Sequence, residues 1–260
     1  MLLNYQIKQS SDNDSDNKIE IIFIIHGLFG SLSNLSTLAN ELQTHSHVVL
    51  IDVRNHGKSP HFDSMSYPEM VADIFNVADH LEVETFSIIG HSMGGKIAMG
   101  CALTNPDRIN SLVIADIAPV CYPDKHSEVF NSLLLLDLKK IKNRLQASEQ
   151  LSRYIDSPDV RQFLLKSLQK KDNVFEFAFN LTALAHNYEY IRGWPFSNKK
   201  YTKSTLFIKG GSSDYILPEH QKLIMGQFPN AQAKIIANTG HWLHAEKAKT
   251  FNRLVMQFFN

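Results

Sequence analysis

Cysteine is scarce in this chain, which has only Cys101 and Cys121 among its 260 residues. A small secreted domain held together by disulfides needs a denser set of paired cysteines, so the sequence excludes that class. We expect both thiols to be free in a reducing cytoplasm. Cys101 lies in an apolar helical pattern and is expected to be a buried, small apolar side chain.

Long apolar runs and an excess of one charge are also missing. No apolar run approaches the roughly 18 residues that cross a bilayer. The segment 1–7 has no basic stretch before an apolar run, so we expect neither a signal peptide nor stable membrane insertion. Lys plus Arg and Asp plus Glu both number 26. The basic excess of a nucleic-acid-binding protein is therefore absent, and no nucleic-acid partner is expected.

Signatures for metals and nucleotide cofactors are missing as well. His45 and His47 lie close together in the sequence but have no third ligand nearby, so we expect no metal site. Gly27 and Gly30 do not form a G-x-G-x-x-G pattern, and no G-K-S/T sequence follows them. We therefore expect a protein without a cofactor.

Segments of strand and helix pattern alternate along most of the chain. The expected strands are 2–8, 19–25, 48–53, 85–89, 112–115, 205–209 and 233–236. The expected helices are 34–43, 66–81, 94–103, 218–227 and 246–259, and the polar residues 10–18 are expected to form an exposed turn. The segment 19–25 is apolar except for Glu20, which is typical of a strand buried on both faces. The alternation predicts an α/β protein with a mostly parallel sheet flanked by helices.

The alternation stops between residues 119 and 200. This segment contains helical patterns at 129–145, 160–169 and 174–190, and no convincing strand. We therefore predict a core formed by residues 1–118 and 201–260, with a helical cap inserted at 119–200.

The sequence Gly90-His91-Ser92-Met93-Gly94 has the G-x-S-x-G form of a nucleophile elbow. It follows a strand pattern and precedes a helical one, which is the context that this turn requires. The small neighbours relieve the crowding of a sharp strand-to-helix turn, and the turn exposes the serine Oγ. Ser92 is therefore the candidate nucleophile.

A serine hydroxyl needs a base within hydrogen-bond reach to become a good nucleophile. His241 follows the last expected strand and is the one histidine well placed near the end of the chain, where the base belongs in the order nucleophile, acid, base. His244 is expected to be a structural neighbour. Two aspartates follow strands and could orient the imidazole: Asp116 and Asp214.

An oxyanion hole needs two backbone N–H groups directed at the developing charge. We expect them from Met93, which follows the nucleophile, and from Leu28, in a glycine-containing loop after an early strand. Phe29, His91 and Trp242, which adjoin these groups in the sequence, are expected to contact the substrate.

With these motifs the chain resembles the α/β-hydrolase superfamily over nearly its full length and, more narrowly, the YbfF-type bacterial esterases. The similar sequences are His26-Gly27-Leu28-Phe29-Gly30-Ser31, Asp52-Val53-Arg54-Asn55-His56-Gly57, Gly90-His91-Ser92-Met93-Gly94-Gly95-Lys96, Asp116-Ile117-Ala118-Pro119-Val120 and Gly240-His241-Trp242-Leu243-His244-Ala245-Glu246-Lys247. Ala248 departs from the family, whose members often have proline there. Asp214 is at the usual position of the acid in this fold. Some family members take the acid from the position of Asp116, so the resemblance favours Asp116 and both stay candidates.

The resemblance implies hydrolysis of carboxylic esters or thioesters, including acyl-CoA-like compounds, through an acyl-enzyme and without a cofactor. It also implies a helical cap. The expected partner is a small acyl ester or thioester, and the expected assembly is a monomer or small homo-oligomer. Two other functions are compatible with the same residues: a carbon–carbon bond hydrolase or lyase, and a non-catalytic ligand-binding protein. Fold-level likeness does not identify the substrate.

Overall fold

The computed structural model describes residues 2–11, 19–172 and 174–259. The expected turn at 10–18 lies outside these residues except for Ser10 and Ser11. None of the helices in the described part of the chain is long and apolar enough to cross a bilayer.

Seven of the described strands form one sheet, in the order β1-β3-β2-β4-β5-β8-β9. β1 pairs antiparallel with β3, and every other pairing in this sheet is parallel. The strands are β1 (Tyr5–Lys8), β2 (Glu20–Ile25), β3 (Ser46–Ile51), β4 (Phe86–His91), β5 (Ile109–Ala115), β8 (Thr205–Gly210) and β9 (Ala231–Ile236). The predicted mostly parallel sheet is therefore confirmed.

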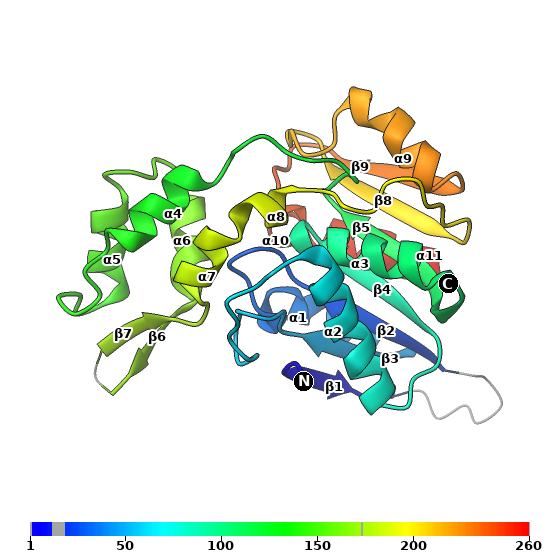
Figure 1. Ribbon diagram of the computed structural model, residues 1–260, viewed down its shortest axis with the longest axis horizontal. Helices are drawn as coiled ribbons and strands as arrows, with labels where there is room; N and C mark the ends of the chain where they lie inside the picture. The colour runs from blue at the N-terminus through cyan, green and yellow to red at the C-terminus, as the bar shows by residue number, and fades with distance from the viewer. Residues whose placement is uncertain (1, 12–18, 173, 260) are drawn as a thin grey trace.

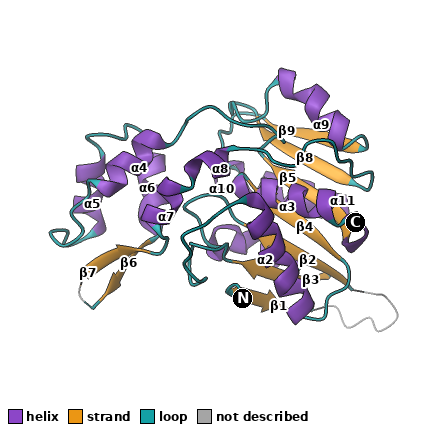
Figure 2. Ribbon diagram, in the orientation of Figure 1, coloured by secondary structure: helices purple, strands orange, loops and turns teal. Residues whose placement is uncertain are grey.

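Helices cover both faces of this sheet (Figures 1 and 2). One face packs against α2 (Tyr67–His80) and α3 (Met93–Thr104), whose buried side chains join Phe23, Phe86 and Ile88 in the larger core cluster. The opposite face packs against α1 (Ser36–Leu42) and α11 (Ala248–Phe259). Because both faces are covered, the central strands are continuously apolar, as buried parallel strands are.

The other core helices lie close to their expected positions. A short 3₁₀ turn, η1 (Leu32–Leu35), precedes α1, and η3 (Pro218–His220) precedes α9 (Gln221–Gln227). The predicted helix 246–259 is divided into α10 (Leu243–Glu246) and α11. At α2 the capping box forms, with the backbone N–H of Ser66 donating to Glu69 Oε2 at 2.8 Å.

The segment between β5 and β8 lies to one side of the sheet and contains more than helices (Figure 1). The expectation that it holds no strand is wrong, because β6 and β7 form an antiparallel hairpin. Three of the four residues from Val174 to Phe177 are β-branched or aromatic, which favours a strand. The elements are α4 (Ser127–Leu134), α5 (Arg144–Leu151), α6 (Pro158–Lys166), β6 (Leu168–Lys171), β7 (Val174–Phe177), α7 (Leu181–His186) and α8 (Tyr188–Arg192).

Two predicted long helices in this segment are also wrong, and N-cap residues explain where the new helices begin. The helix expected over 129–145 ends at Leu134, and a new one begins after Asn143, whose side chain accepts from the backbone N–H of Gln146. The helix expected over 174–190 begins only after Asn180, which accepts from Ala183 N–H. Asparagine favours such positions because its side chain satisfies a backbone donor that has no partner within the helix.

Candidate active site

Ser92 lies at the turn between β4 and α3 in a backbone conformation that few residues adopt. Its φ is 53° and its ψ −120°. Both nearby glycines are required, because a Cβ at Gly90 would overlap the carbonyl oxygen of Gly94, and a Cβ at Gly94 would overlap that of Ile25. This close packing of helix against strands holds the turn, and its strain is of the kind found at functional sites.

Ser92, His241 and Asp116 form one hydrogen-bonded chain. Ser92 Oγ lies 2.9 Å from His241 Nε2, and His241 Nδ1 lies 2.8 Å from Asp116 Oδ2. A carboxylate can only accept, so Nδ1 carries the proton and Nε2 accepts from the serine hydroxyl. The structure thus brings together three of the four residues expected to form the triad, in the arrangement of a serine hydrolase.

Asp116 follows β5 and is fully buried. Its φ of 51° turns the side chain towards the neighbouring strand. The backbone N–H of Gly210 donates to Oδ1 at 2.8 Å, and the hydroxyl of Ser213 donates to Oδ2. These bonds hold the carboxylate in place for the imidazole.

Asp214 does not have this relationship to His241. Its side chain is 69% exposed and pairs with Lys125 Nζ at 2.6 Å. The hydrogen bond from Lys125 lowers the pKa of the Asp214 carboxyl. Among the described residues no hydrogen bond joins Asp214 to His241, so the structure brings only one of the two candidate acids to the imidazole.

The loop after β2 carries Leu28, and two buried histidines hold it. Phe29, at φ 62°, donates its backbone N–H to His56 Nε2 at 3.1 Å. His56 Nδ1 donates to the carbonyl of Arg54 at 3.0 Å, and His26 Nε2 accepts from the backbone N–H of Val53 at 3.0 Å. Both imidazoles are neutral in this arrangement, and burial lowers the pKa of His56 to about 3.

The two expected oxyanion donors come from the loop after β2, which carries Leu28, and from the start of α3, at Met93. Within the described chain, neither Leu28 N–H nor Met93 N–H has a protein acceptor. Met93 is the first residue of α3, where backbone N–H groups have no partner in the helix. Both N–H groups are therefore available to a substrate oxygen. The sequence motifs included His26 and His56, but their support of this loop was missed because it depends on contacts between distant segments.

The His91 ring lies against the His241 imidazole, and His244 packs against His91. His91 Nε2 donates to the backbone carbonyl of His241 at 2.9 Å, and its ring lies 4.3 Å from that of His244. Burial lowers the pKa of His91 well below its usual value and that of His244 to about 3. The Tyr215 ring stacks on His241 at a centroid distance of 3.8 Å. The His241 imidazole therefore contacts the rings of both His91 and Tyr215.

A cavity of about 260 Å³, here the large chamber, opens on Ser92 from the side of His241. The three expected substrate contacts Phe29, His91 and Trp242 all line it. The lining residues are Gly27, Leu28, Phe29, His91, Ser92, Lys125, His126, Val129, Val160, Phe163, Leu164, Asp214, Tyr215, His241 and Trp242. Val129 on α4 and Phe163 on α6 belong to the segment between β5 and β8, so that segment forms part of its wall.

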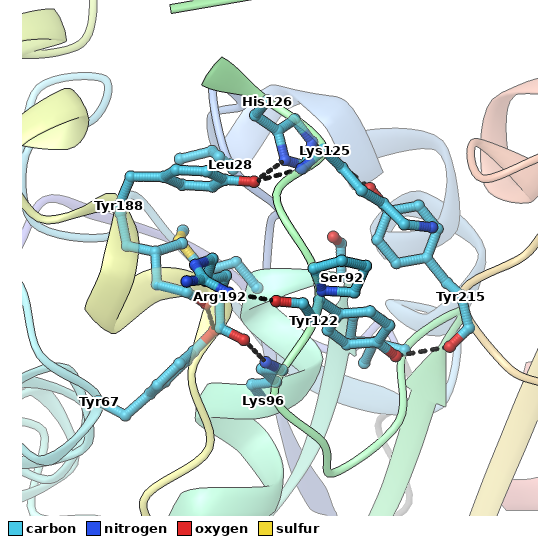
Figure 3. Close-up of a pocket in the computed structure, with 14 residues that line it drawn as sticks. Leu28, Tyr67, Ser92, Lys96, Tyr122, Lys125, His126, Tyr188, Arg192 and Tyr215 are labelled. Carbon is cyan, nitrogen blue, oxygen red and sulfur yellow. Dashed lines mark hydrogen bonds between the residues drawn. The ribbon is translucent and has the colours of Figure 1, made fainter. Parts of the chain in front are cut away.

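A second cavity, here the small chamber, also reaches Ser92 and has a volume of about 40 Å³ (Figure 3). Its lining residues are Leu28, Tyr67, Ser92, Met93, Lys96, Ile117, Tyr122, Pro123, Lys125, His126, Tyr188, Ile191, Arg192 and Tyr215. The oxyanion candidate Met93 lines this chamber but not the large one, whereas His241 lines only the large one.

The described residues contain no group of three histidine, cysteine, aspartate or glutamate side chains arranged to hold a metal ion. At Ser92 the described residues place a serine hydroxyl against an imidazole and a carboxylate.

The chain belongs to the α/β hydrolase fold family, whose model matches residues 20–248. Esterase YbfF of Escherichia coli strain K12 is 37% identical over 253 residues, which cover 97% of both chains. The sn-1-specific diacylglycerol lipase ABHD11 of Mus musculus is 36% identical over 253 residues, covering 94% of this chain and 82% of that protein. A solved marine microorganism esterase is 36% identical, with a TM-score of 0.92 and 99% of each chain covered.

Proposed function

We propose that this protein is a serine hydrolase that cleaves carboxylic esters, with Ser92 as the nucleophile, His241 as the general base and Asp116 as the triad acid. The observation that carries the proposal is the unbroken hydrogen-bond chain from Ser92 Oγ through His241 to the buried carboxylate of Asp116. Relatives named as an esterase and as a lipase support the ester as the bond that is cleaved.

In the proposed mechanism Ser92 Oγ attacks the ester carbonyl while its proton passes to His241 Nε2. The Asp116 carboxylate stabilises the imidazolium that forms. Leu28 N–H and Met93 N–H donate to the oxyanion of the tetrahedral intermediate. His241 then protonates the leaving oxygen, and a water molecule activated by the same imidazole releases the acid from Ser92.

We assign the two parts of the ester to the two chambers. His241 must reach the leaving oxygen, so the alcohol or thiol part is assigned to the large chamber, against Phe29, His91 and Trp242. The acyl part is assigned to the small chamber, beside Met93. Segment 119–200 would then act as a lid over both parts of the substrate, because it contributes Val129 and Phe163 to the large chamber and Tyr122 and Tyr188 to the small one.

Thioesters, including acyl-CoA compounds, would follow the same steps, since a thiolate also leaves from a tetrahedral intermediate.

Cys101 and Cys121 are both free thiols, which supports a cytoplasmic location.

The proposal is tested by the hydrolysis of 4-nitrophenyl butyrate at neutral pH with EDTA, by the wild type and by Ser92→Ala. We expect turnover by the wild type and a loss of at least about 10³-fold in the variant. Full turnover by Ser92→Ala would contradict the proposal. No turnover by folded wild type would favour a carbon–carbon hydrolase, a lyase or a ligand-binding protein.

A further inference from the structure

The strand β9 forms one edge of the seven-stranded sheet, at the opposite end from β1 (Figure 1). In the part of the chain that the structure describes, no other strand pairs with its outer edge. The residues 232–235 of this strand are all exposed. An open edge presents unpaired backbone N–H and C=O groups, and it can therefore pair with a strand of another chain.

A hydrogen bond at the end of β9 shows which of its residues direct their backbone groups outwards. Gly211 donates its backbone N–H to the carbonyl of Ile236 at 2.9 Å, so the backbone groups of Ile236 point towards β8. The backbone groups of successive residues in a strand point to opposite sides. Those of Ala231, Ala233 and Ile235 therefore point away from the sheet.

The same three residues adjoin an apolar surface. They line a groove of about 370 Å³ between the edge of the sheet and α9, whose Met225 also lines it. Ile235 is 66% exposed and Met225 is 41% exposed, and Leu223 on the same helix is 53% exposed. Exposed apolar side chains that gather beside an open sheet edge indicate a site for a protein partner.

The backbone of β9 is complementary to a second copy of itself in one antiparallel register. With a twofold axis through Ala233, each Ala233 lies opposite the other, and each Ile235 lies opposite Ala231 of the second copy. All of these residues direct their backbone groups outwards, so they can form the hydrogen-bonded pairs of an antiparallel ladder. Ala231 needs only to accept there, since its N–H already donates to the carbonyl of Phe228 at 3.0 Å.

The side chains of β9 fit the same register in polarity and charge. Ala231, Ala233 and Ile235 lie on the face of the sheet that carries α9, so apolar side chains would lie opposite apolar ones. On the other face, Lys234 is the charged residue of the strand and would lie opposite the neutral Gln232. A register centred on Lys234 would place two like charges opposite each other, which is unfavourable.

We propose that the outer edge of β9 is a homodimer interface, where two copies of this chain pair antiparallel about a twofold axis at Ala233 and form one continuous sheet. The α9 helices of both copies would then lie on the same face of the joined sheet, where the groove and Leu223 can be covered. A closed twofold pairing also leaves no outer edge of β9 for further strands. No residue of β9 or α9 lines either chamber, so the proposal does not depend on the proposed function.

The size of the contact determines how strong this dimer should be. A strand of six residues is about 20 Å long, and α9 adds seven residues beside it. Interfaces below the standard area of roughly 800 Å² per partner usually belong to weak complexes. We therefore expect a dissociation constant in roughly the micromolar range.

Sedimentation equilibrium of the full chain, from about 1 to 200 μM, measures this constant. We expect the mean mass to rise with concentration from the 29.5 kDa of one chain towards twice that value. Ala233→Pro should raise the dissociation constant at least about tenfold, because it removes the central hydrogen bonds of the interface. The N–H that proline lacks points outwards, so the pairing of β9 with β8 should stay intact.

Charged residues at position 233 test the register. Ala233 would lie opposite its own copy, so Ala233→Asp and Ala233→Lys should each be monomeric, and an equimolar mixture of the two variants should form a heterodimer. Ile7→Asp is the matched control, because Ile7 lies on β1 at the other edge of the sheet and is 44% exposed. It should dimerise like the wild type. Thermal unfolding followed by circular dichroism separates a loss of pairing from a loss of fold.

Each outcome supports or overturns the proposal. Dissociation in the single variants and recovery in the mixture would support it. A wild type that is monomeric at every concentration would overturn it and leave the groove to a small apolar ligand or to another protein. A dimer that dissociates in Ile7→Asp and persists in the Ala233 variants would also overturn it. Charged variants that fold and stay monomeric when mixed would overturn the register centred on Ala233.

Discussion

Asp116 and His241 are 125 positions apart in the sequence and are joined by a hydrogen bond of 2.8 Å from Nδ1 to Oδ2. Asp116 directly follows β5, which lies between β8 and β4, the strand that leads to Ser92, so its carboxylate starts close to Ser92. Asp214 lies one strand further out and is bound to Lys125. In the proposed triad, the position of each aspartate in the sheet therefore determines which of them reaches His241.

Substitution of the two aspartates should give opposite results. We expect Asp116→Asn to lower kcat by about 10³- to 10⁴-fold, because an amide favours the wrong tautomer of His241 and does not stabilise its imidazolium. Asp214→Asn should change kcat less than about threefold, since it removes only an exposed ion pair. Initial rates with 4-nitrophenyl butyrate measure both, and a larger loss in Asp214→Asn would contradict the assignment of the acid.

The loop that carries Leu28 should depend on His56 as an acceptor. In His56→Leu the backbone N–H of Phe29 loses its buried partner, which costs about 1–3 kcal/mol of stability and lets the loop move. We expect kcat to fall about tenfold or more, with a smaller change in KM. His56→Gln is the control, since its amide oxygen can accept from Phe29. Equal kcat in both variants and the wild type would show that this bond does not position the loop.

Stacking of Tyr215 on His241 should matter more than the Tyr215 hydroxyl. Tyr215→Phe keeps the ring that lies 3.8 Å from the imidazole, so we expect kcat within about threefold of the wild type. Tyr215→Leu removes the flat surface and lets the imidazole tilt, and small displacements of a catalytic group cost up to about 10²-fold. A decrease of tenfold or more in kcat is expected for Tyr215→Leu and not for Tyr215→Phe. Similar kcat for the two variants would contradict this.

Acid should destabilise the protein because buried histidines stay neutral. Burial lowers the pKa of His56 and His244 to about 3 from 6.5, so the unfolded state binds more protons as the pH falls below 6.5. Their contribution to stability is complete above pH 6.5 and is lost progressively between 6.5 and about 3. Each histidine adds about 1.4 kcal/mol per pH unit to that slope.

His244→Leu tests this dependence. Nδ1 of His244 has no hydrogen-bond partner within the described chain, so leucine removes a titrating group without breaking a bond at that atom. The free energy of unfolding, measured by urea denaturation between pH 7 and pH 4, should fall less steeply in the variant than in the wild type. An unchanged slope would show that His244 titrates normally in the folded protein.

Local patterns were sufficient to predict the sheet, its covering helices and the elbow. Each of these features depends on residues only a few positions apart, so a single sequence is enough to predict it. They are the alternating apolar runs, the capping box before α2 and the glycines around Ser92. The same reasoning failed between residues 119 and 200. There the apolar pattern was too short to separate a strand from a helix, and the caps at Asn143 and Asn180 divided the predicted helices.

The sequence by itself determined the nucleophile and base candidates, the order of the core elements and two possible acids. Only the tertiary structure brought Asp116 rather than Asp214 to His241. It also placed His56 where it accepts from the Phe29 backbone N–H, and it left Lys96 in the small chamber without a carboxylate partner among the described residues. The physical reason is the separation along the chain of the residues that interact. Helices, strands and turns depend on neighbours along the chain, whereas a triad, a loop support and an unpaired buried charge depend on hydrogen bonds and burial between segments up to about 150 residues apart.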